Sequence, residues 1–175
     1  IYRLWKSGVK KRILFLADRN ALLTQTKNGD FSPFGNDIMH IIKNRKIDKS
    51  YQIYFALYQG LTSTDEDKNA YKEFSKDFFD LVVIDEASQL LEPMLLGLVS
   101  QFTKVVLIGD HKQLPAVVTQ SSTHSEVKDK ELQSIGLEDM SESLFQRMYN
   151  QALKQNWTWA MGVLTQQGRM HKDIM

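Results

Sequence analysis

The chain has 175 residues, which is the length of one ordinary domain, and 42% of them are hydrophobic and 25% charged. No apolar run approaches the ~20 residues needed to span a bilayer, and the basic start "IYRLWKSGVKKR" excludes a typical signal peptide. A net charge of +1 excludes a histone-like nucleic-acid binder, and zero cysteines exclude disulfides and thiolate metal sites. We therefore expect a soluble globular protein of a reducing, cytoplasmic compartment.

The first predicted elements are a strand and a helix. Residues 12–17 are apolar apart from Arg12 and predict a strand. Asp18 can cap a helix over 19–27, which Asn28 and Gly29 would end.

A second helix and a second strand are predicted next. Apolar residues at helical spacing predict a helix over 32–46, and the aromatic and β-branched run "SYQIYFALYQG" predicts a strand over 50–60 that Gly60 ends. The polar stretch 63–78 is compatible with a helical crossover.

The second half contains two nearly continuous apolar segments, "DLVVIDE" (80–86) and "KVVLIGD" (104–110). Such strands are typical of a parallel sheet and are buried on both faces. Between them, 93–102 predicts a helix with Pro93 at its first position. The alternation of strands and helices predicts an α/β fold, a parallel sheet with helices on both faces.

The remaining residues predict one loop and one helix. Residues 119–135, beginning with the polar "TQSSTHSEVKDK", are expected to form a surface loop insertion within a single domain spanning 1–175. A helix is predicted over 141–154. The four histidines show no metal-ligand spacing.

Acidic residues follow both of the apolar strands in the second half. Asp85 and Glu86 end one strand, and Gly109 and Asp110 end the other. Ligands of an open parallel sheet bind beyond the carboxyl ends of its strands, so both acidic segments should reach one edge. The pair suits phosphoryl transfer, in which one carboxylate holds Mg²⁺ and another deprotonates water. The alternative is that each acid only caps the following helix.

The segments "DEASQ" (85–89) and "GDHKQLP" (109–115) resemble motifs II and III of superfamily 1 helicases, D-E-A-x-Q and G-D-x-x-Q-L-P. "ESLFQRM" (142–148) and "LTQQGRMH" (164–171) resemble the next family segments in the correct order. The family has a tyrosine where Gly168 stands, so the likeness does not extend to that aromatic ring. This resemblance covers 80–175 and is closest to nonsense-mediated-decay and replication-associated helicases.

The first half resembles a different family. "RILFLADRNALLTQTKN", "NRKIDKSYQIYFALYQGLT" and "YKEFSKDFFDLVVIDE" are similar to the superfamily 2 motor of type I restriction enzyme R subunits, over 12–86. R subunits continue with D-E-C-H where this chain has "DEAS". Both resemblances imply a RecA-like P-loop NTPase lobe, and together they suggest a natural mosaic or a fusion.

The helicase resemblance implies a role for each matching residue in binding ATP and Mg²⁺. Asp85 would coordinate Mg²⁺, and Glu86 would be the catalytic base. Gln113 would sense the γ-phosphate, with Gly109 and Asp110 beside it. Arg169 would stabilise the transition state as an arginine finger does, or it is simply a surface cation.

A nucleic-acid contact is predicted where such motors touch the phosphate backbone. The segment "LADRN" occupies the place of motif Ia, and a second strand end would contribute to the same surface. The predicted contacts are Arg19, Asn20, Tyr58, Gln59 and Gly60. The alternative is that Asp18 and Asn20 only cap a helix and that Tyr58 belongs to the core.

These residues contain no G-x-x-x-x-G-K-[ST] phosphate-binding loop. Both families carry it before motif Ia, so we expect it before Ile1 and a second motor lobe after Met175. The chain would then be truncated at both ends and have little or no ATPase activity alone.

The leading hypothesis is a fragment of an ATP-dependent helicase or translocase acting on single-stranded or duplex DNA or RNA. The alternatives are a type I restriction-type DNA translocase subunit and a non-catalytic RecA-like module that binds nucleic acid or a partner.

Overall fold

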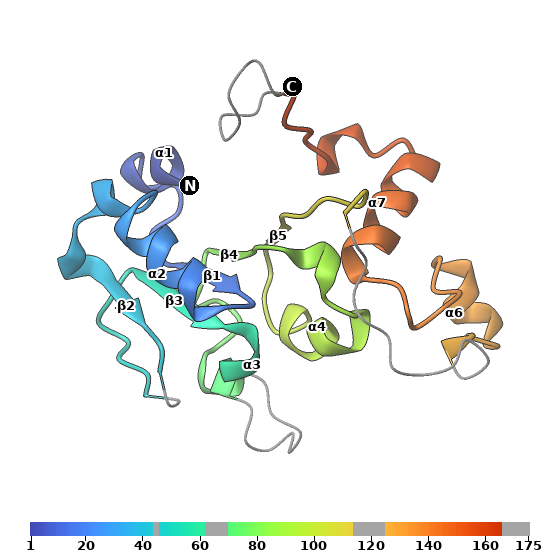
Figure 1. Cartoon of the computed structure of the whole chain (residues 1–175), viewed down its shortest axis with the longest axis horizontal. Coiled ribbons are helices and arrows are strands. Elements are labelled where there is room, and N and C mark those ends of the chain that lie inside the picture. Colours follow the sequence, from blue (N-terminus) through green and yellow to red (C-terminus); the bar gives the residue numbers. More distant parts are fainter. Residues whose placement is uncertain (44–45, 62–69, 114–124, 166–175) are drawn as a thin grey trace.

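The structure, a computed structural model, describes residues 1–43, 46–61, 70–113 and 125–165 (Figure 1). The described residues contain one five-stranded sheet of order β2-β3-β1-β4-β5. Its strands are β1 (Ile13–Ala17), β2 (Met39–Ile41), β3 (Ile53–Leu57), β4 (Leu81–Ile84) and β5 (Val105–Leu107). Every neighbouring pair is parallel, as the strand-helix alternation predicted.

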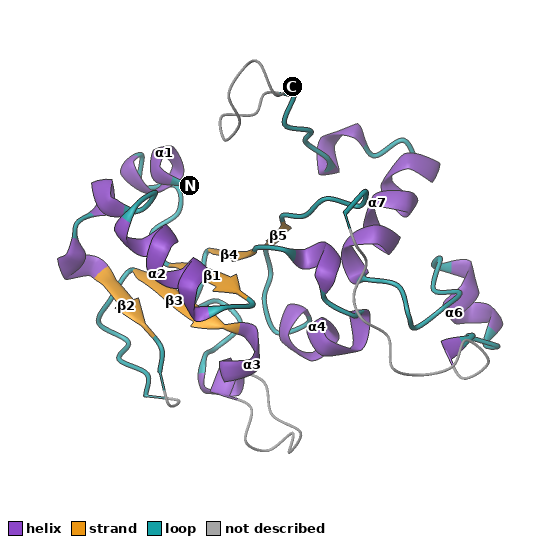
Figure 2. Cartoon of the chain, in the orientation of Figure 1, coloured by secondary structure: helices purple, strands orange, loops and turns teal. Residues whose placement is uncertain are grey.

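The α-helices of the described residues differ widely in length (Figure 2). The longer ones are α2 (Asn20–Asn28), α4 (Glu92–Val99) and α7 (Leu144–Lys154), and the short ones are α1 (Tyr2–Lys6), α3 (Tyr58–Leu61) and α6 (Lys130–Ser134). None of them has the length and apolar character needed to cross a bilayer.

The core consists of two apolar clusters, one on each face of the sheet. Alternate side chains of β1 point to opposite faces, so Leu14 and Leu16 belong to one cluster and Phe15 to the other. The first cluster includes residues of α4 and α7, whereas the second includes residues of α2. The predicted α/β architecture with helices on both faces is therefore confirmed.

The predicted helix over 32–46 is wrong. Two short 3₁₀ helices, Ser32–Phe34 and Asn36–Ile38, lead into the strand β2 instead. Gly35 between them has φ +83, which interrupts a right-handed helix. The apolar residues that suggested helical spacing pair with β3, where Met39 lies opposite Ile53. Strand pairing thus overrides the local pattern.

Three element ends differ from the prediction. The third strand along the chain, β3, ends at Leu57, and Gly60 lies within the short helix α3 rather than ending the strand. The Asp18 side chain does not cap α2, whose N-cap residue is Arg19 with no side-chain capping bond. The last predicted helix starts later, at Leu144, because the Ser143 hydroxyl caps it by accepting a hydrogen bond from the backbone N–H of Gln146 at 3.1 Å.

Burial separates the two apolar strands that were predicted to be alike. All of β4 is buried, as expected, but in β5 the prediction is wrong because Val106 is 45% exposed. The cause is position: β4 lies between β1 and β5, whereas β5 pairs within the described residues with β4 alone.

Two connecting segments are described only in part. Of the predicted loop insertion 119–135, residues 119–124 lie outside the described residues, and Lys130–Ser134 is the short helix α6, capped by Asp129. Of the polar crossover 63–78, residues 63–69 lie outside the described residues, and Ala70–Glu73 is a 3₁₀ turn.

Asp80, directly before β4, supplies a pH-dependent contribution to stability. Its Oδ2 accepts hydrogen bonds from the backbone N–H groups of Lys11 (2.8 Å) and Arg12 (2.9 Å). The Arg12 bond is the largest cause that lowers the pKa of Asp80 from its ordinary value of 3.8. The stabilisation is therefore present above pH 3.8 and is lost as the pH falls through the lower folded-state pKa.

We expect Asp80→Asn to lower the free energy of unfolding at neutral pH by about 1 kcal/mol, since solvent screens the partly exposed carboxylate. Urea unfolding at neutral and acid pH measures this, and the difference from wild type should vanish in strong acid. Asp77→Asn, at an exposed neighbouring acid, is the control. An equal effect of both substitutions would contradict the assignment.

Candidate functional site

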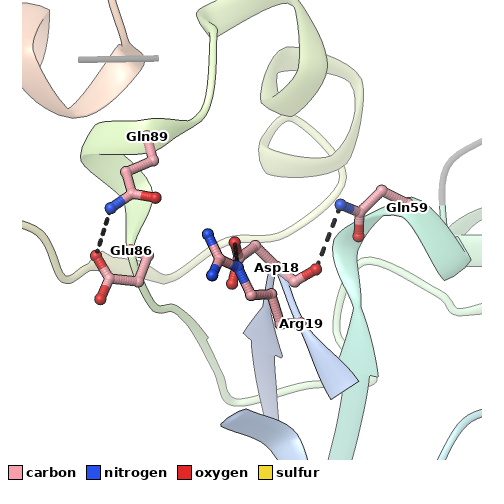
Figure 3. Close-up of polar contacts among 5 residues, drawn as sticks. All are labelled: Asp18, Arg19, Gln59, Glu86 and Gln89. Carbon is pink, nitrogen blue, oxygen red and sulfur yellow. Dashed lines mark hydrogen bonds and ion pairs between the residues drawn. The ribbon is translucent and has the colours of Figure 1, made fainter. Parts of the chain in front are cut away.

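The candidate site is built on a tight turn after β4. Glu86 has φ 53 and ψ 33, a left-handed conformation that is strained for a residue other than glycine. Its backbone N–H donates to Asp85 Oδ1 at 3.1 Å. Figure 3 shows the second contact, in which the Gln89 side-chain amide donates to Glu86 Oε2 at 3.3 Å. The turn thus places both carboxylates beyond the strand end and holds the one on Glu86.

The end of β5 is joined directly to this turn. The Ala87 N–H donates to the Ile108 carbonyl at 2.8 Å, and the Asp110 N–H donates to Ser88 Oγ at 3.3 Å. Ser88 is buried, and sequence reasoning gave it no role because it occupies the variable position of D-E-A-x-Q. The structure therefore brings together the two acidic segments that the sequence placed at one edge of the sheet.

Gly109 permits this close approach. A Cβ atom at this position would lie 2.9 Å from the Ser88 backbone nitrogen, so the backbone would have to move. We expect Gly109→Ala to lower the free energy of unfolding by about 1–3 kcal/mol, measured by urea denaturation. Gly162→Ala is the matched control, since a Cβ there meets nothing within 4 Å. Equal stability of the two variants would contradict the packing argument.

Asp110 organises the segment that follows β5. Its Oδ1 accepts a hydrogen bond from the Lys112 N–H at 2.9 Å, and its Oδ2 accepts one from the Gln113 side-chain amide at 3.4 Å. The side chains of this segment are exposed, so they are available to a ligand. Arg169, the predicted arginine finger, lies outside the described residues.

The predicted nucleic-acid residues lie at the ends of β1 and β3. Asp18 Oδ2 accepts a hydrogen bond from Arg19 Nε at 3.0 Å, and its carbonyl accepts one from the Gln59 amide at 3.4 Å (Figure 3). Arg19, with its side chain 73% exposed, is open to a phosphate. Asn20, Gln59 and Gly60 are also exposed, whereas Tyr58 is half-buried against the core.

Asp18 is the residue at this edge whose burial the sequence did not anticipate. Its Oδ1 is buried and has no hydrogen-bond partner within the part of the chain that the structure describes. Asp18 follows β1, whose Leu16 carbonyl accepts a hydrogen bond from the Asp85 N–H at 2.9 Å. A third acid therefore follows the strand next to the Asp85–Glu86 turn.

The donor chemistry suits a magnesium ion that is held mainly by a bound phosphate. Across the described residues, no three His, Cys, Asp or Glu side chains gather closely enough to hold a metal. Mg²⁺ is commonly bound by one or two carboxylates together with substrate phosphates and water, and Asp85 offers one carboxylate directly after β4.

Comparison with known proteins gives one family match and several partial relatives. A family profile described as "Type III restriction enzyme, res subunit" matches residues 1–110. The chain is similar to the Type I restriction enzyme EcoAI endonuclease subunit of Escherichia coli, with 59% identity over 86 residues, which are 49% of this chain and 10% of that protein.

Two further relatives are named as a helicase/nuclease and an exoribonuclease. Human DNA replication ATP-dependent helicase/nuclease DNA2 is 40% identical over 102 residues, 58% of this chain and 8% of that protein. Mouse 3'-5' exoribonuclease HELZ2 is 40% identical over 97 residues, which are 53% of this chain and 3% of that protein. The chain thus spans a tenth or less of these relatives. Likeness to type I restriction enzymes and to replication helicases is confirmed; the division into superfamilies 1 and 2 stays a prediction.

Proposed function

The chain belongs to the family of type III restriction enzyme res subunits, and on that premise we propose that it is part of an ATP-driven helicase or translocase motor. The observation that carries the proposal is the joining of the two acidic segments, Asp85–Glu86 and Gly109–Asp110, at the carboxyl edge of one parallel sheet. The relatives named as an ATP-dependent helicase and a restriction subunit support the same reaction class.

In the proposed mechanism, each acid of the turn has a separate task. Asp85 would hold Mg²⁺, which neutralises charge on the ATP phosphates when bound. Glu86 would accept a proton from the water that attacks the γ-phosphorus, as the bond to the β-phosphate oxygen breaks. The Gln89 amide holds the Glu86 carboxylate in place, and Gln113, held by Asp110, would contact the γ-phosphate.

Within the described residues β5 pairs with β4 alone, and we propose that the rest of the motor completes the sheet along its other edge. Val106 and Ile108 are apolar, yet their side chains are 45% and 40% exposed. We propose that a phosphate-binding loop and a second lobe, which both family resemblances imply, complete the motor. We propose that the chain alone hydrolyses ATP weakly or not at all.

The nucleic-acid track is proposed to run over the ends of β1 and β3. Arg19 offers an exposed guanidinium, and Asn20, Gln59 and Gly60 lie on the same edge. Backbone phosphates bind such arginine, amide and main-chain donors without reading sequence. The substrate is therefore proposed to be single-stranded or duplex DNA or RNA.

A strand-displacement assay with the intact parent protein tests the function. With Mg²⁺ and ATP, the protein is expected to displace a third strand from a triplex or one strand from a duplex, but not with a non-hydrolysable ATP analogue. Triplex displacement without duplex unwinding would favour the restriction-type translocase. Nucleic-acid binding without any displacement would contradict the motor and favour the non-catalytic module.

A further inference from the structure

An aromatic stack joins the segment after β5 to the helix α7. The imidazole of His111 lies on the ring of Tyr149 with centroids 4.4 Å apart and planes 22° from parallel. His111 stands between Asp110 and Gln113 and is exposed, whereas Tyr149 is half-buried. Stacked rings stabilise one another beyond their buried area.

The helix that presents Tyr149 is itself fixed in place. Arg147 donates from Nε to Glu92 Oε2 at 2.7 Å and from Nη2 to Glu92 Oε1 at 2.5 Å, and both side chains are buried. Arg147 Nη1 also donates to the Ile135 carbonyl at 3.1 Å. This bidentate ion pair joins α7 to α4. Tyr149, which lies on α7, therefore has little freedom to move relative to α4.

The contacts form a closed ring that includes the turn after β4. The chain runs from the Glu86 turn through Ala87–Gln89 into α4, and α4 is joined to α7 by the Glu92–Arg147 pair. The Tyr149–His111 stack leads from α7 to Asp110, whose N–H donates to Ser88 and so closes the ring at the turn. The Asp110–Gln113 segment is therefore held from two sides.

We infer that Tyr149 is a positioning residue, which sets the place of Asp110 and Gln113 relative to Asp85 and Glu86 through its stack on His111. The expected effect of Tyr149 on ATP turnover rests on the proposed function, but its role in fixing the position of the Asp110–Gln113 segment does not. Tyr149 lies far along the chain from "GDHKQLP", and only the fold brings them together.

NMR on the full 175-residue chain tests whether Tyr149 fixes the position of the Asp110–Gln113 segment. A tyrosine ring stacked on an imidazole shifts the carbon-bound proton signals of His111. Tyr149→Leu is expected to remove that shift and alter the Asp110 amide signal, whereas Tyr149→Phe keeps both. Tyr51→Leu is the matched control, because Tyr51 stacks on His40 at 4.9 Å and 22° in another part of the molecule. Unchanged His111 and Asp110 signals in folded Tyr149→Leu would overturn the inference.

Turnover by the intact parent protein tests the consequence. Tyr149→Leu is expected to lower kcat for ATP by about three- to tenfold, with KM changed less than about twofold, since the stack contributes no ligand contact. Tyr149→Phe should restore kcat, and His111→Leu, at an exposed position, should lower it equally. An unchanged kcat beside altered His111 signals would overturn the positioning role. An inactive wild-type parent protein would instead contradict the proposed function. The NMR result would still show whether Tyr149 positions the Asp110–Gln113 segment.

Discussion

Replacement of Glu86 by glutamine in the intact parent protein is expected to lower kcat for ATP by about 10²–10⁴-fold, the usual contribution of a general base. Glutamine keeps the size of the side chain and can still contact Gln89, but it cannot accept a proton at neutral pH. The KM for ATP should change little, because Glu86 acts on water rather than on the nucleotide. Steady-state hydrolysis with Mg²⁺ measures both constants.

The matched control is Glu131→Gln, which makes the same chemical change at an exposed position in the short helix α6. It should leave kcat unchanged. Far-UV circular dichroism should show equal folding of both variants. Turnover by Glu86→Gln at the wild-type rate would remove Glu86 from the mechanism, whatever the rate of the control.

The second large effect is expected in stability, at the buried ion pair between α4 and α7. Arg147→Met would leave the Glu92 carboxylate, 1% exposed, without its counter-charge. Removing one partner of a buried pair costs about 3–5 kcal/mol, and we expect a decrease of that size in the free energy of unfolding. Urea denaturation of the full chain measures it.

Two variants separate the lost pairing from other effects of the substitution. The double variant Glu92→Leu with Arg147→Met should be less destabilised than the sum of its single variants, since no unpaired charge stays buried. Arg19→Ala removes the exposed pair with Asp18 and should change stability by less than about 1 kcal/mol. Equal losses from Arg147→Met and Arg19→Ala would show that burial does not set the strength of the Glu92–Arg147 pair.

The sequence predicted those strands of the sheet whose burial on both faces produces a continuous apolar run. The strands β1 and β4 are nearly continuous apolar runs because helices cover both of their faces, and this pattern needs no knowledge of neighbours. The second strand β2 gave no such signal, since its three residues lie among apolar residues at helical spacing. The exposure of β5 was also missed, because the sequence does not state which strand lies at an edge.

The candidate site was predictable as far as parallel strands dictate it. Two strands ending in acids must deliver them to the same edge, and the structure joins Asp85–Glu86 to Gly109–Asp110 as expected. Ser88 and Tyr149 could not be found in this way. Ser88 occupies a variable motif position, and Tyr149 lies far from His111 along the chain and reaches it only through the packing of α7.

We propose that the carboxyl edge of this sheet hydrolyses ATP to drive movement on nucleic acid. The most direct test is steady-state ATP turnover by the intact parent protein with Mg²⁺, in the presence and absence of single-stranded DNA and RNA. Turnover that rises when one nucleic acid is added is the predicted result, and it would identify the track. No turnover from folded protein with either nucleic acid would contradict the claim.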